Sequence, residues 1–533
     1  MIALPETFNV AVYFVDRNVL EGRGGRIAIE SGDEQVSYQQ LLERTNRTGN
    51  ALRQLGVRAE ERVVLLLQDC PEFLSSFFGI IKIGAVAVPT NTYLKPPEYE
   101  YLLNDSRARI LLVSEALLPV LRLIPEQHLR YLRQIIVVGE PNIVGESKPG
   151  YLRLADLMAA ASPDLEPEPT SRDDVAFWLY SSGSTGVSKG CVHLHHDMVV
   201  CSELYAKGIL GMNEQDRCYS VARLFFAYGL GNAGYFPLSC GATTILSPAR
   251  PSLAGIFADL ERYNPTLFFS VPSNYADLLA HQRENGVEFD LSSVRQAISA
   301  GESLPAPLLE RFQRRFGIEI LDGLGSTETL QMVISNRPGE VRPGSSGKII
   351  PGYEAKIVDL DGCPVAPGEI GSLLIKGDST CAGYWNQHEK TKETFEGPWF
   401  RTGDKYSQDE DGYFWYAGRA DDLFKVNGRW LSPAEVESAL VAHPAIREAA
   451  VIAREDESKL TKPAAYVVVN PTFQPSDELV RELQDWVVQR IGAYKHPRWI
   501  EFVSDLPKTT TGKLQRFKLR ELQAQKLEER PTS

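Results

Sequence analysis

Tyr180-Ser-Ser-Gly-Ser-Thr-Gly-Val-Ser-Lys-Gly190 is a run of glycines and small hydroxyl residues that ends in a lysine and another glycine. It follows Val175-Ala-Phe-Trp-Leu-Tyr180, an apolar run that predicts a buried strand. A strand that leads into such a loop is typical of a phosphate-binding site. Glycines let backbone N–H groups approach the oxyanions, while hydroxyls and a lysine add donors and positive charge. The spacing is not that of a Walker A loop, and the alternative is a flexible surface loop rich in serine and glycine.

Strand and helix patterns alternate around this loop, up to about residue 420. Residues 62–68 predict a buried strand, residues 71–82 a helix with proline in its first turn, and residues 85–89 the next strand. The same cycle recurs at 108–114, 243–246, 266–271 and 296–300. This alternation predicts parallel sheets covered by helices, with ligands at the carboxyl ends of the strands.

The length of 533 residues exceeds one ordinary core and predicts more than one domain. From about Ser345 the chain changes to short strands between Gly- and Pro-rich turns, which indicates a β-rich subdomain. We expect an α/β fold with a large N-terminal adenylation domain (1–420) of two helix-covered parallel-type sheets plus this subdomain. A small, mobile α+β lid domain (421–533) is expected to follow, with its last dozen residues disordered.

Composition excludes several classes of protein. A hydrophobic content of 43% and a charged content of 23% are typical of soluble globular proteins. The net charge of −13 argues against a nucleic-acid partner but not against a nucleotide held locally by loops. Seven scattered cysteines without paired spacing argue against a zinc site or a disulfide framework. The first residues lack the pattern of a signal peptide and no apolar run reaches membrane-spanning length, so we expect a cytoplasmic protein.

The loop at 180–190 resembles the phosphate loop of the adenylate-forming superfamily, which includes acyl- and aryl-CoA synthetases, luciferases and peptide-synthetase adenylation domains. Five further motifs resemble that family in its own order along nearly the whole chain. They are Ile81-Lys-Ile-Gly-Ala-Val-Ala-Val-Pro89, Asp322-Gly-Leu-Gly-Ser-Thr-Glu328, Trp399-Phe-Arg-Thr-Gly-Asp404, Gly418-Arg-Ala-Asp-Asp-Leu-Phe-Lys-Val-Asn-Gly428 and Pro507-Lys-Thr-Thr-Thr-Gly-Lys513. The resemblance implies an enzyme that joins a carboxylate to ATP, releases pyrophosphate, and passes the acyl group to a thiol.

The resemblance also implies roles for single residues. Lys513 would be the catalytic bridge between the carboxylate and the α-phosphate, as a point charge on a long stem. Glu328 and Thr185 would be catalytic through Mg²⁺, which Glu328 holds on the phosphates with Thr185 and Thr327 as neighbouring oxygen donors. Asp404 would accept both ribose hydroxyls. The expected ATP-binding set is Ser181, Ser182, Gly183, Ser184, Thr185, Gly186, Lys189, Ala300, Gly301, Glu302, Asp322, Gly323, Ser326, Thr327, Asp404, Tyr416, Arg419 and Lys513.

Asp421 stands where the family has its hinge. The resemblance implies that the small domain rotates after adenylation, withdraws Lys513 and forms a tunnel for the thiol. Lys425, Gly428 and Trp430 are the expected CoA-binding residues. The alternative for Asp421 is an ordinary turn or helix-cap aspartate.

Residues 223–232 and 323–336 resemble the benzoate-CoA ligase branch, which also takes substituted benzoates. A flat aromatic acid needs an apolar slot with glycines for close approach. The expected aryl-acid-binding residues are Ala227, Tyr228, Gly229, Ser299, Leu324, Gly325, Leu330, Gln331 and Ile334, some of which are alternatively plain core residues. Gln331 stands where this branch commonly has histidine and Arg223 stands near a usual lysine, so a hydroxy- or aminobenzoate is nearly as plausible as benzoate itself.

Three functions remain open at this level. The first is an aryl-CoA ligase that uses ATP, Mg²⁺ and coenzyme A and releases AMP and pyrophosphate. The second is a stand-alone aryl-acid adenylating enzyme that loads the phosphopantetheine arm of a carrier protein. The third is a non-catalytic relative, which predicts loss of Lys513, Glu328 or the loop, and all three are intact. We expect a monomer or homodimer without nucleic-acid or membrane partners.

Overall fold

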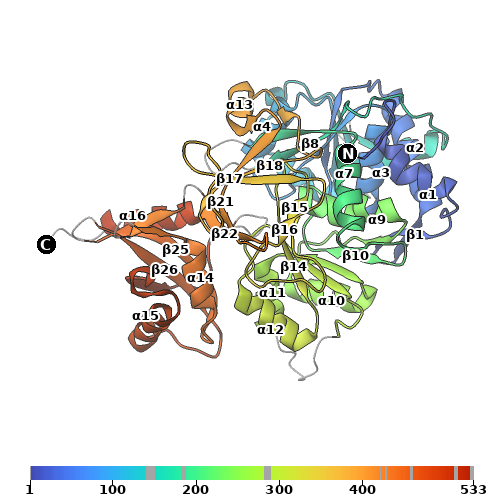
Figure 1. Cartoon of the computed structure of the whole chain (residues 1–533). Helices are drawn as coiled ribbons and strands as arrows, with labels where there is room; N and C mark the ends of the chain where they lie inside the picture. Colours follow the sequence, from blue (N-terminus) through green and yellow to red (C-terminus); the bar gives the residue numbers. More distant parts are fainter. Residues whose placement is uncertain are drawn as a thin grey trace.

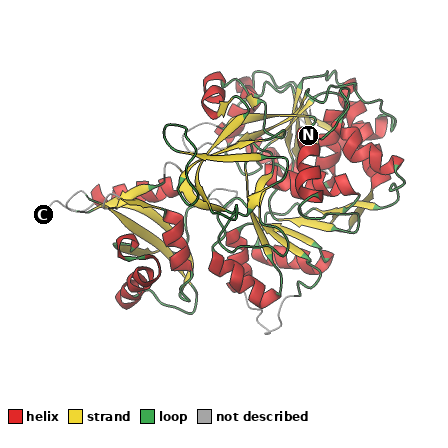
Figure 2. Ribbon diagram, viewed as in Figure 1, coloured by secondary structure: helices red, strands yellow, loops and turns green. Residues whose placement is uncertain are grey.

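The computed structural model describes residues 2–139, 151–181, 188–280, 290–419, 422–426, 429–456, 460–508 and 514–528. Figure 1 shows a large body, a group of strands at its edge that includes β17, β18, β21 and β22, and a smaller body made by the C-terminal residues. Helices surround the strands of the large body and lie beside those of the small one (Figure 2). Within the described part of the chain, no helix has both the length and the apolar character that a membrane-spanning segment needs.

The first sheet has eight strands in the order β19-β9-β8-β4-β3-β5-β6-β7. Neighbours from β8 to β7 are parallel, whereas the β8/β9 and β9/β19 pairs are antiparallel. The strands are β3 (Arg62–Leu66), β4 (Val86–Pro89), β5 (Ile110–Ser114), β6 (Gln134–Val138), β7 (Tyr151–Arg153), β8 (Val175–Ser181), β9 (Lys189–Leu194) and β19 (Gly383–Tyr384). The serine- and glycine-rich loop therefore joins two adjacent strands, β8 and β9.

The second sheet has nine strands in the order β16-β15-β14-β13-β12-β10-β11-β1-β2. Neighbours from β14 to β1 are parallel, and the pairs at both ends are antiparallel. The strands are β1 (Ile27–Ser31), β2 (Glu34–Ser37), β10 (Arg217–Ser220), β11 (Thr243–Ile245), β12 (Leu267–Ser270), β13 (Gln296–Ser299), β14 (Ile320–Gly325), β15 (Met332–Ser335) and β16 (Lys348–Ile349).

Helices pack on both sheets and fill the space between them. The longer ones are α2 (Tyr38–Gln54), α3 (Pro71–Lys82), α4 (Pro96–Asp105), α10 (Leu253–Tyr263), α11 (Pro272–Ala280) and α12 (Ala306–Phe316). Shorter ones are α1 (Arg17–Leu20), α5 (Leu118–Leu121), α6 (Leu154–Ala160), α7 (Asp197–Cys201), α8 (Ala227–Leu230), α9 (Phe236–Cys240) and α13 (His388–Thr394). Single 3₁₀ or π segments are η1 (Val12–Asp16), η2 (Glu115–Leu117), η3 (Glu126–His128), η4 (Ser202–Lys207), η5 (Gly231–Tyr235) and η6 (Ala493–Lys495).

Helix α3 shows why the core is stable. Its apolar residues, such as Phe77 and Phe78, are fully buried, and the helix packs against α2 and against β3 and β4 of the first sheet. The one cation on this helix, Lys82, is 1% exposed, and its Nζ lies 2.5 Å from Asp16 Oδ1 and 2.7 Å from Asn46 Oδ1. A buried charge is tolerated when it is paired and hydrogen-bonded in this way.

A smaller sheet with the order β17-β18-β21-β20, to which β22 is added on β21, forms a half-barrel beside the two large sheets. Its strands are β17 (Glu354–Val358), β18 (Gly371–Lys376), β20 (Phe395–Glu396), β21 (Trp399–Gln408) and β22 (Phe414–Arg419). All of its pairs are antiparallel. This is the β-rich subdomain that the Gly- and Pro-rich texture predicts.

The C-terminal body has its own core and its own sheet. The elements are β23 (Phe424–Val426), β24 (Arg429–Leu431), α14 (Pro433–Val441), β25 (Ile446–Glu455), β26 (Thr461–Val469), α15 (Asp477–Ile491), β27 (Trp499–Phe502) and α16 (Arg516–Glu528). Leu440, Val451, Val467 and Leu483 are buried in its centre. It contacts the large body through α14, which packs against α12 (Figure 1).

The predicted fold class is confirmed, with two corrections. The large sheets are mixed because short connections return β9 and β15 antiparallel to their predecessors, a pairing that parallel-type sheets do not contain. The last dozen residues are not all without structure, since α16 continues to Glu528. This helix is anchored by buried Leu519 and by the ion pair of Arg520 with Asp422, which composition does not reveal.

Candidate active site

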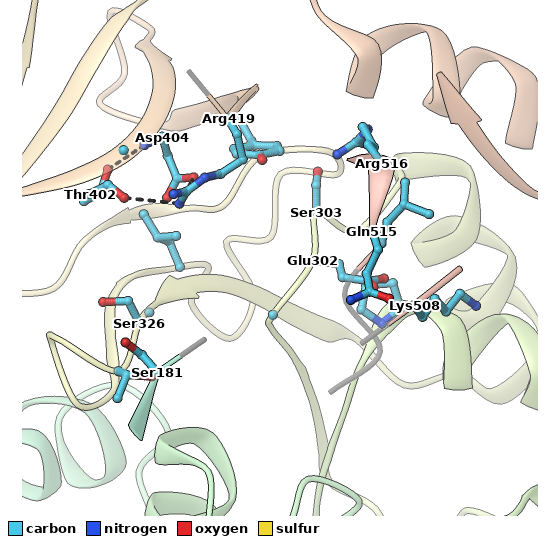
Figure 3. Close-up of a pocket in the computed structure, with 18 of the residues that line it drawn as sticks. Ser181, Glu302, Ser303, Ser326, Thr402, Asp404, Arg419, Lys508, Gln515 and Arg516 are labelled. Atoms are coloured by element: carbon cyan, nitrogen blue, oxygen red, sulfur yellow. Dashed lines mark hydrogen bonds and ion pairs between the residues drawn. The ribbon is translucent and has the colours of Figure 1, made fainter. Parts of the chain in front are cut away.

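A cavity of about 1130 Å³ lies where the two large sheets, the half-barrel and the C-terminal body meet. Figure 3 shows side chains from all of these parts facing the same space. A second cavity of about 350 Å³ adjoins it. Tyr93, Phe226, Ser273, Gly301, Gly325, Ser326, Thr327 and Lys508 line both. A ligand that occupies both cavities would therefore lie against these shared residues.

The two ends of the phosphate-loop sequence lie at this cavity. Ser181 at the end of β8 and Lys189 at the start of β9 are register partners, and both line the wall. The predicted residues Ser182, Gly183, Ser184, Thr185 and Gly186 lie outside the described residues. Ser181 lies at the carboxyl end of β8, which is parallel to β4, and α/β folds bind ligands at such strand ends.

Glu328 lies in a tight turn directly after β14. Ser326 and Thr329 close this turn through reciprocal hydrogen bonds of 3.0 and 3.2 Å between backbone N–H groups and hydroxyls. The Glu328 carboxylate lines the large cavity, where its Oε1 accepts a hydrogen bond of 2.8 Å from the hydroxyl of Tyr384. Its carbonyl accepts the backbone N–H of Cys381 at 2.7 Å. Both the side chain and the backbone of Glu328 are thereby held.

The residue before Glu328 is held by a histidine that sequence reasoning missed. Nε2 of His193 lies 2.8 Å from the carbonyl oxygen of Thr327, and Nδ1 lies 2.8 Å from Oδ2 of Asp197. His193 and Asp197 are fully buried, and the imidazole stacks on Phe177. His193 lies four residues after Lys189 and on the same face of β9, and this alternation is the signal in the sequence that could have identified it.

Asp404 and Arg419 face each other across β21 and β22. They are register partners, and Nη1 of Arg419 lies 3.0 Å from Oδ1 of Asp404 and 3.2 Å from the carbonyl of Thr402 (Figure 3). Gly403 has φ +77°, a backbone conformation that favours glycine, and a side chain there would displace the guanidinium of Arg419. Tyr416 lines the same wall, and burial together with nearby Asp404 raises the pKa of its phenol.

The adenine candidates come from the ends of β13 and β14. Gly301, Glu302, Asp322 and Gly323 line the large cavity, and Ala300 lines the smaller one. Gly301 has φ +90°, which favours glycine where the chain turns out of β13. Asp322 is 4% exposed, and burial raises the pKa of its carboxyl well above the usual range.

The smaller cavity contains five of the expected aryl-acid residues: Ala227, Tyr228, Gly325, Leu330 and Gln331. Leu324 lines the larger cavity instead. Gly229, Ser299 and Ile334 are buried but are not among the residues that line either cavity. The alternative of a core role therefore fits these last three residues better than direct contact with a ligand.

Gln331 is 3% exposed and its amide is already engaged. Nε2 donates to the carbonyl of Tyr228 at 3.1 Å and to Oδ1 of Asn232 at 3.2 Å. Oε1 accepts the backbone N–H of Met332 at 3.1 Å. Both N–H donors of the side chain are therefore used within the protein, and only acceptor capacity on Oε1 is left for a ligand.

Arg223, the other residue that differs from the branch, is a buried cation that lines the smaller cavity. Its Nε donates to the hydroxyl of Tyr93 at 3.1 Å, and Nη1 lies 3.4 Å from Oδ2 of Asp69. Its guanidinium also donates to the carbonyls of Ser247 and Ala249. Burial raises the pKa of Asp69 to about 6, although the neighbouring guanidinium opposes this shift.

The C-terminal body closes the cavity with Lys508, Gln515 and Arg516 (Figure 3). Nζ of Lys508 lies 2.5 Å from Oε2 of Glu448. Lys513 lies outside the described residues, but the residues on either side of its segment, Lys508 and Leu514, form an antiparallel bridge and both line the cavity.

Arg516 forms a two-pronged ion pair with Glu437, with both oxygens 2.8 Å from Nη2, and a 3.3 Å contact with Asp422. Asp421 and Gly428 lie outside the described residues, and of Trp430 only the backbone is described. Trp430 pairs with Lys425 between β24 and β23. Neither residue belongs to the described lining of the two cavities.

Comparison with known proteins agrees with this geometry. The AMP-binding enzyme family matches residues 16–385, and the AMP-binding enzyme C-terminal domain matches residues 435–513. A benzoate–CoA ligase of Thauera aromatica is 46% identical over 97% of both chains. A 4-hydroxybenzoate–CoA/benzoate–CoA ligase of Rhodopseudomonas palustris is 44% identical over 97% of this chain and 94% of its own.

Two solved structures are similar along the whole chain. The anthranilate CoA ligase AuaEII in complex with anthranoyl-AMP has a TM-score of 0.93 at 43% identity, covering 98% of this chain and 99% of its own. A benzoate CoA ligase from Burkholderia xenovorans LB400 has a TM-score of 0.87 at 44% identity, covering 96% of this chain and 100% of its own. The chain therefore belongs to the AMP-binding enzymes of the adenylate-forming superfamily and lies close to their benzoate–CoA ligases.

Proposed function

We propose that this protein is an AMP-forming acid–thiol ligase that activates benzoate or a hydroxy- or amino-substituted benzoate. ATP and the acid form an aryl adenylate and pyrophosphate, and CoA then displaces AMP to give the thioester. The observation that carries this proposal is the small cavity of about 350 Å³, which shares lining residues such as Gly325 and Thr327 with the larger one. Relatives named for benzoate, hydroxybenzoate and anthranilate support the same class of acid. Because ATP and CoA are its co-substrates, we place the protein in the cytoplasm.

The first half-reaction brings two anions together, so positioning and charge neutralisation matter more than acid–base chemistry. Lys513 bridges the carboxylate and the α-phosphate in our proposal. Support comes from Lys508 and Leu514, which bracket its segment at the cavity wall. Lys189 supplies a second positive charge at the end of the phosphate loop.

The residues around Glu328 fit a magnesium ion. The Glu328 carboxylate faces the cavity, Thr327 lines the same wall, and Mg²⁺ prefers such oxygen donors. We propose that Glu328 and Thr185 hold the ion, with Thr327 as their neighbour. The bound ion neutralises phosphate charge. Tyr384 and His193 keep the turn that carries Glu328 in place.

The nucleoside lies between the half-barrel and the ends of β13 and β14 in this proposal. Asp404 accepts the ribose hydroxyls, and its ion pair with Arg419 orients the carboxylate. Tyr416 packs beside the nucleoside. The adenine lies along Ala300–Glu302 and Asp322–Gly323. We propose that the other residues of the expected ATP-binding set also contact ATP.

The ring of the acid occupies the smaller cavity beside Ala227, Tyr228 and Gly325. Substituents that donate a hydrogen bond are favoured, because Oε1 of Gln331 has acceptor capacity left while its N–H groups are used. Hydroxyl and amino groups are donors of this kind. The preference for a polar substituent thus rests on one acceptor atom.

The same site serves the second half-reaction after a domain rotation. We propose a boundary at residues 420/421, with Asp421 as the hinge of the 421–533 lid and with Lys425, Gly428 and Trp430 facing CoA after rotation. The present arrangement suits adenylation, because Lys508 and Leu514, which bracket the segment of Lys513, both lie at the cavity.

An AMP-release assay over a panel of benzoates tests the proposal. Purified protein receives ATP, Mg²⁺ and one acid, with CoA present or absent, and the products are identified by mass spectrometry. We expect AMP release in multiple turnovers only when CoA is present, together with the aryl-CoA. A tightly held aryl adenylate that CoA does not discharge, but that a phosphopantetheinylated carrier protein does, would instead establish carrier loading. Absence of any aryl adenylate would refute both.

A further inference from the structure

Tyr384 contacts both of the charged side chains expected to meet the phosphates of ATP. Its hydroxyl donates to Oε1 of Glu328 at 2.8 Å, and Nζ of Lys189 lies 4.4 Å from the centre of its ring. All three side chains line the large cavity. No sequence motif assigned a role to Tyr384, and the contact with Glu328 spans 56 positions of the chain.

The backbone of Tyr384 is fixed on both sides. It lies in β19 as the register partner of Cys191 on β9, and its N–H donates to the hydroxyl of Thr391 at 3.0 Å. The next residue, Trp385, donates its N–H to the carbonyl of Gly190 at 2.8 Å. With 7% of the residue exposed and Phe395 against the edge of its ring, the phenol has little freedom to turn away.

Lys189 and Glu328 carry opposite charges and both contact Tyr384, yet the ion pairs found among the described residues do not join these two side chains. A direct pair would neutralise the cation and the anion that a magnesium–nucleotide complex needs. The ring face attracts the ammonium, and the hydroxyl holds the carboxylate, so the two charges are kept in separate places. One side chain can do both because an aromatic ring carries its attraction for cations on the face and its hydroxyl at the edge.

We propose that Tyr384 is a positioning residue that keeps Lys189 and Glu328 apart and directed at the phosphates and the magnesium ion of ATP. This inference rests on the proposed function, which assigns the phosphates to Lys189 and the ion to Glu328. It adds a residue that binds neither the aryl acid nor CoA. Its effect is confined to nucleotide binding, with and without the metal, and to the adenylation step.

Two variants separate the two contacts. Tyr384→Phe keeps the ring beneath Lys189 and removes only the hydroxyl, whereas Tyr384→Leu removes both. Tyr38→Phe is the matched control, because the hydroxyl of Tyr38 is also buried and donates at 2.6 Å, but to the carbonyl of Ala242 away from both cavities. Circular dichroism and thermal melting establish that each variant is folded.

The main measurement is calorimetric binding of a non-hydrolysable ATP analogue over a series of Mg²⁺ concentrations. For Tyr384→Phe we expect the Mg²⁺ concentration at half-maximal binding to rise about tenfold or more, with metal-free affinity close to wild type. For Tyr384→Leu we expect the same shift and, in addition, metal-free affinity about 2- to 30-fold weaker, because Lys189 loses its aromatic contact. Tyr38→Phe should behave as wild type in both measurements.

Steady-state kinetics gives the second readout. The KM for the aryl acid should stay unchanged in Tyr384→Phe, since Tyr384 is outside the smaller cavity, while kcat falls and recovers in part at high Mg²⁺. A wild-type Mg²⁺ dependence of binding in Tyr384→Phe would overturn the proposal. Identical behaviour of the Leu and Phe variants would overturn the role of the ring. If the wild type formed no adenylate, the proposed function would fail, whereas the binding comparison would still decide the role of Tyr384.

Discussion

Replacing Gln331 with leucine separates a structural role of this residue from a role in substrate choice. The amide makes three hydrogen bonds inside the protein, to the carbonyl of Tyr228, to Oδ1 of Asn232 and to the N–H of Met332. Each such bond contributes about 1 kcal/mol, and leaving its partner buried and unpaired costs more. We therefore expect Gln331→Leu to lower the free energy of unfolding by about 2–4 kcal/mol.

The effect on specificity is a separate quantity. If Oε1 accepts a hydrogen bond from a ring hydroxyl or amino group, its loss removes about 1–3 kcal/mol of preference, or about 5- to 150-fold in kcat/KM. Benzoate itself makes no such bond, so its kcat/KM should change much less. In wild type the donor-substituted acid should exceed benzoate, and in Gln331→Leu this order should reverse.

The assay is kcat/KM for benzoate and its 2-, 3- and 4-hydroxy and amino derivatives, together with urea unfolding of the same preparations. Gln296→Leu is a matched control, because Gln296 is also buried and its Nε2 donates to the carbonyl of Glu319 at 2.9 Å, outside both cavities. It should lose stability and keep the substrate ranking. An unchanged ranking in Gln331→Leu would refute the contact with the ring, and unchanged stability would refute the hydrogen bonds described for its amide.

Three further changes test other parts of the molecule. Lys513→Ala should slow adenylate formation by several orders of magnitude while thioester formation from a supplied aryl adenylate stays near normal, and equal loss in both single-turnover assays would contradict its role. Asp421→Pro fixes φ near −65° and should spare adenylation while stopping transfer to CoA, so normal transfer would place the hinge elsewhere. Burial lowers the pKa of His195 to about 4, so stability present above about pH 6.5 is lost as the pH falls towards 4, by up to about 3 kcal/mol. Urea unfolding at several pH values should show a smaller acid-induced loss in His195→Gln, and equal losses would contradict the assignment. The pKa of Asp69 is raised to about 6, so this residue makes the folded state more stable as the pH falls. Wild type and His195→Gln both contain Asp69, so its contribution cancels when their free energies of unfolding are compared.

Local pattern was sufficient to predict much of the fold and one side of the site. The strands at 62–68 and 85–89 and the helix at 71–82 were found because apolar periodicity is set by the element itself. Ser181 and Glu328 face one cavity, as expected from motifs that follow buried strands.

The supporting residues were not predictable in the same way. Tyr384 reaches Glu328 across 56 positions and His193 reaches Thr327 across 134, and both contacts depend on β9 and β19 joining the first sheet antiparallel. That strand order cannot be predicted from a single sequence. For Gln331 the sequence predicts the position in the wall of the smaller cavity, and the structure agrees. The hydrogen-bond partners of its amide are not predictable in this way, because they depend on how α8 packs against the residues around Gln331.

The ion pairs of the C-terminal body bear on where the domain rotation that we propose would take place. Arg516 follows Lys513 by three residues and is held by Glu437 and by Asp422, while Arg520 donates twice to Oδ1 of Asp422 at 3.1 Å. Arg516 and Asp422 are 14% and 11% exposed, so breaking this cluster would leave charges that are only partly hydrated. A rotation that keeps the cluster intact carries the catalytic-lysine segment together with Asp422 as one unit. The torsions that change must then precede residue 422, and this argues for Asp421 rather than for any residue inside the small domain.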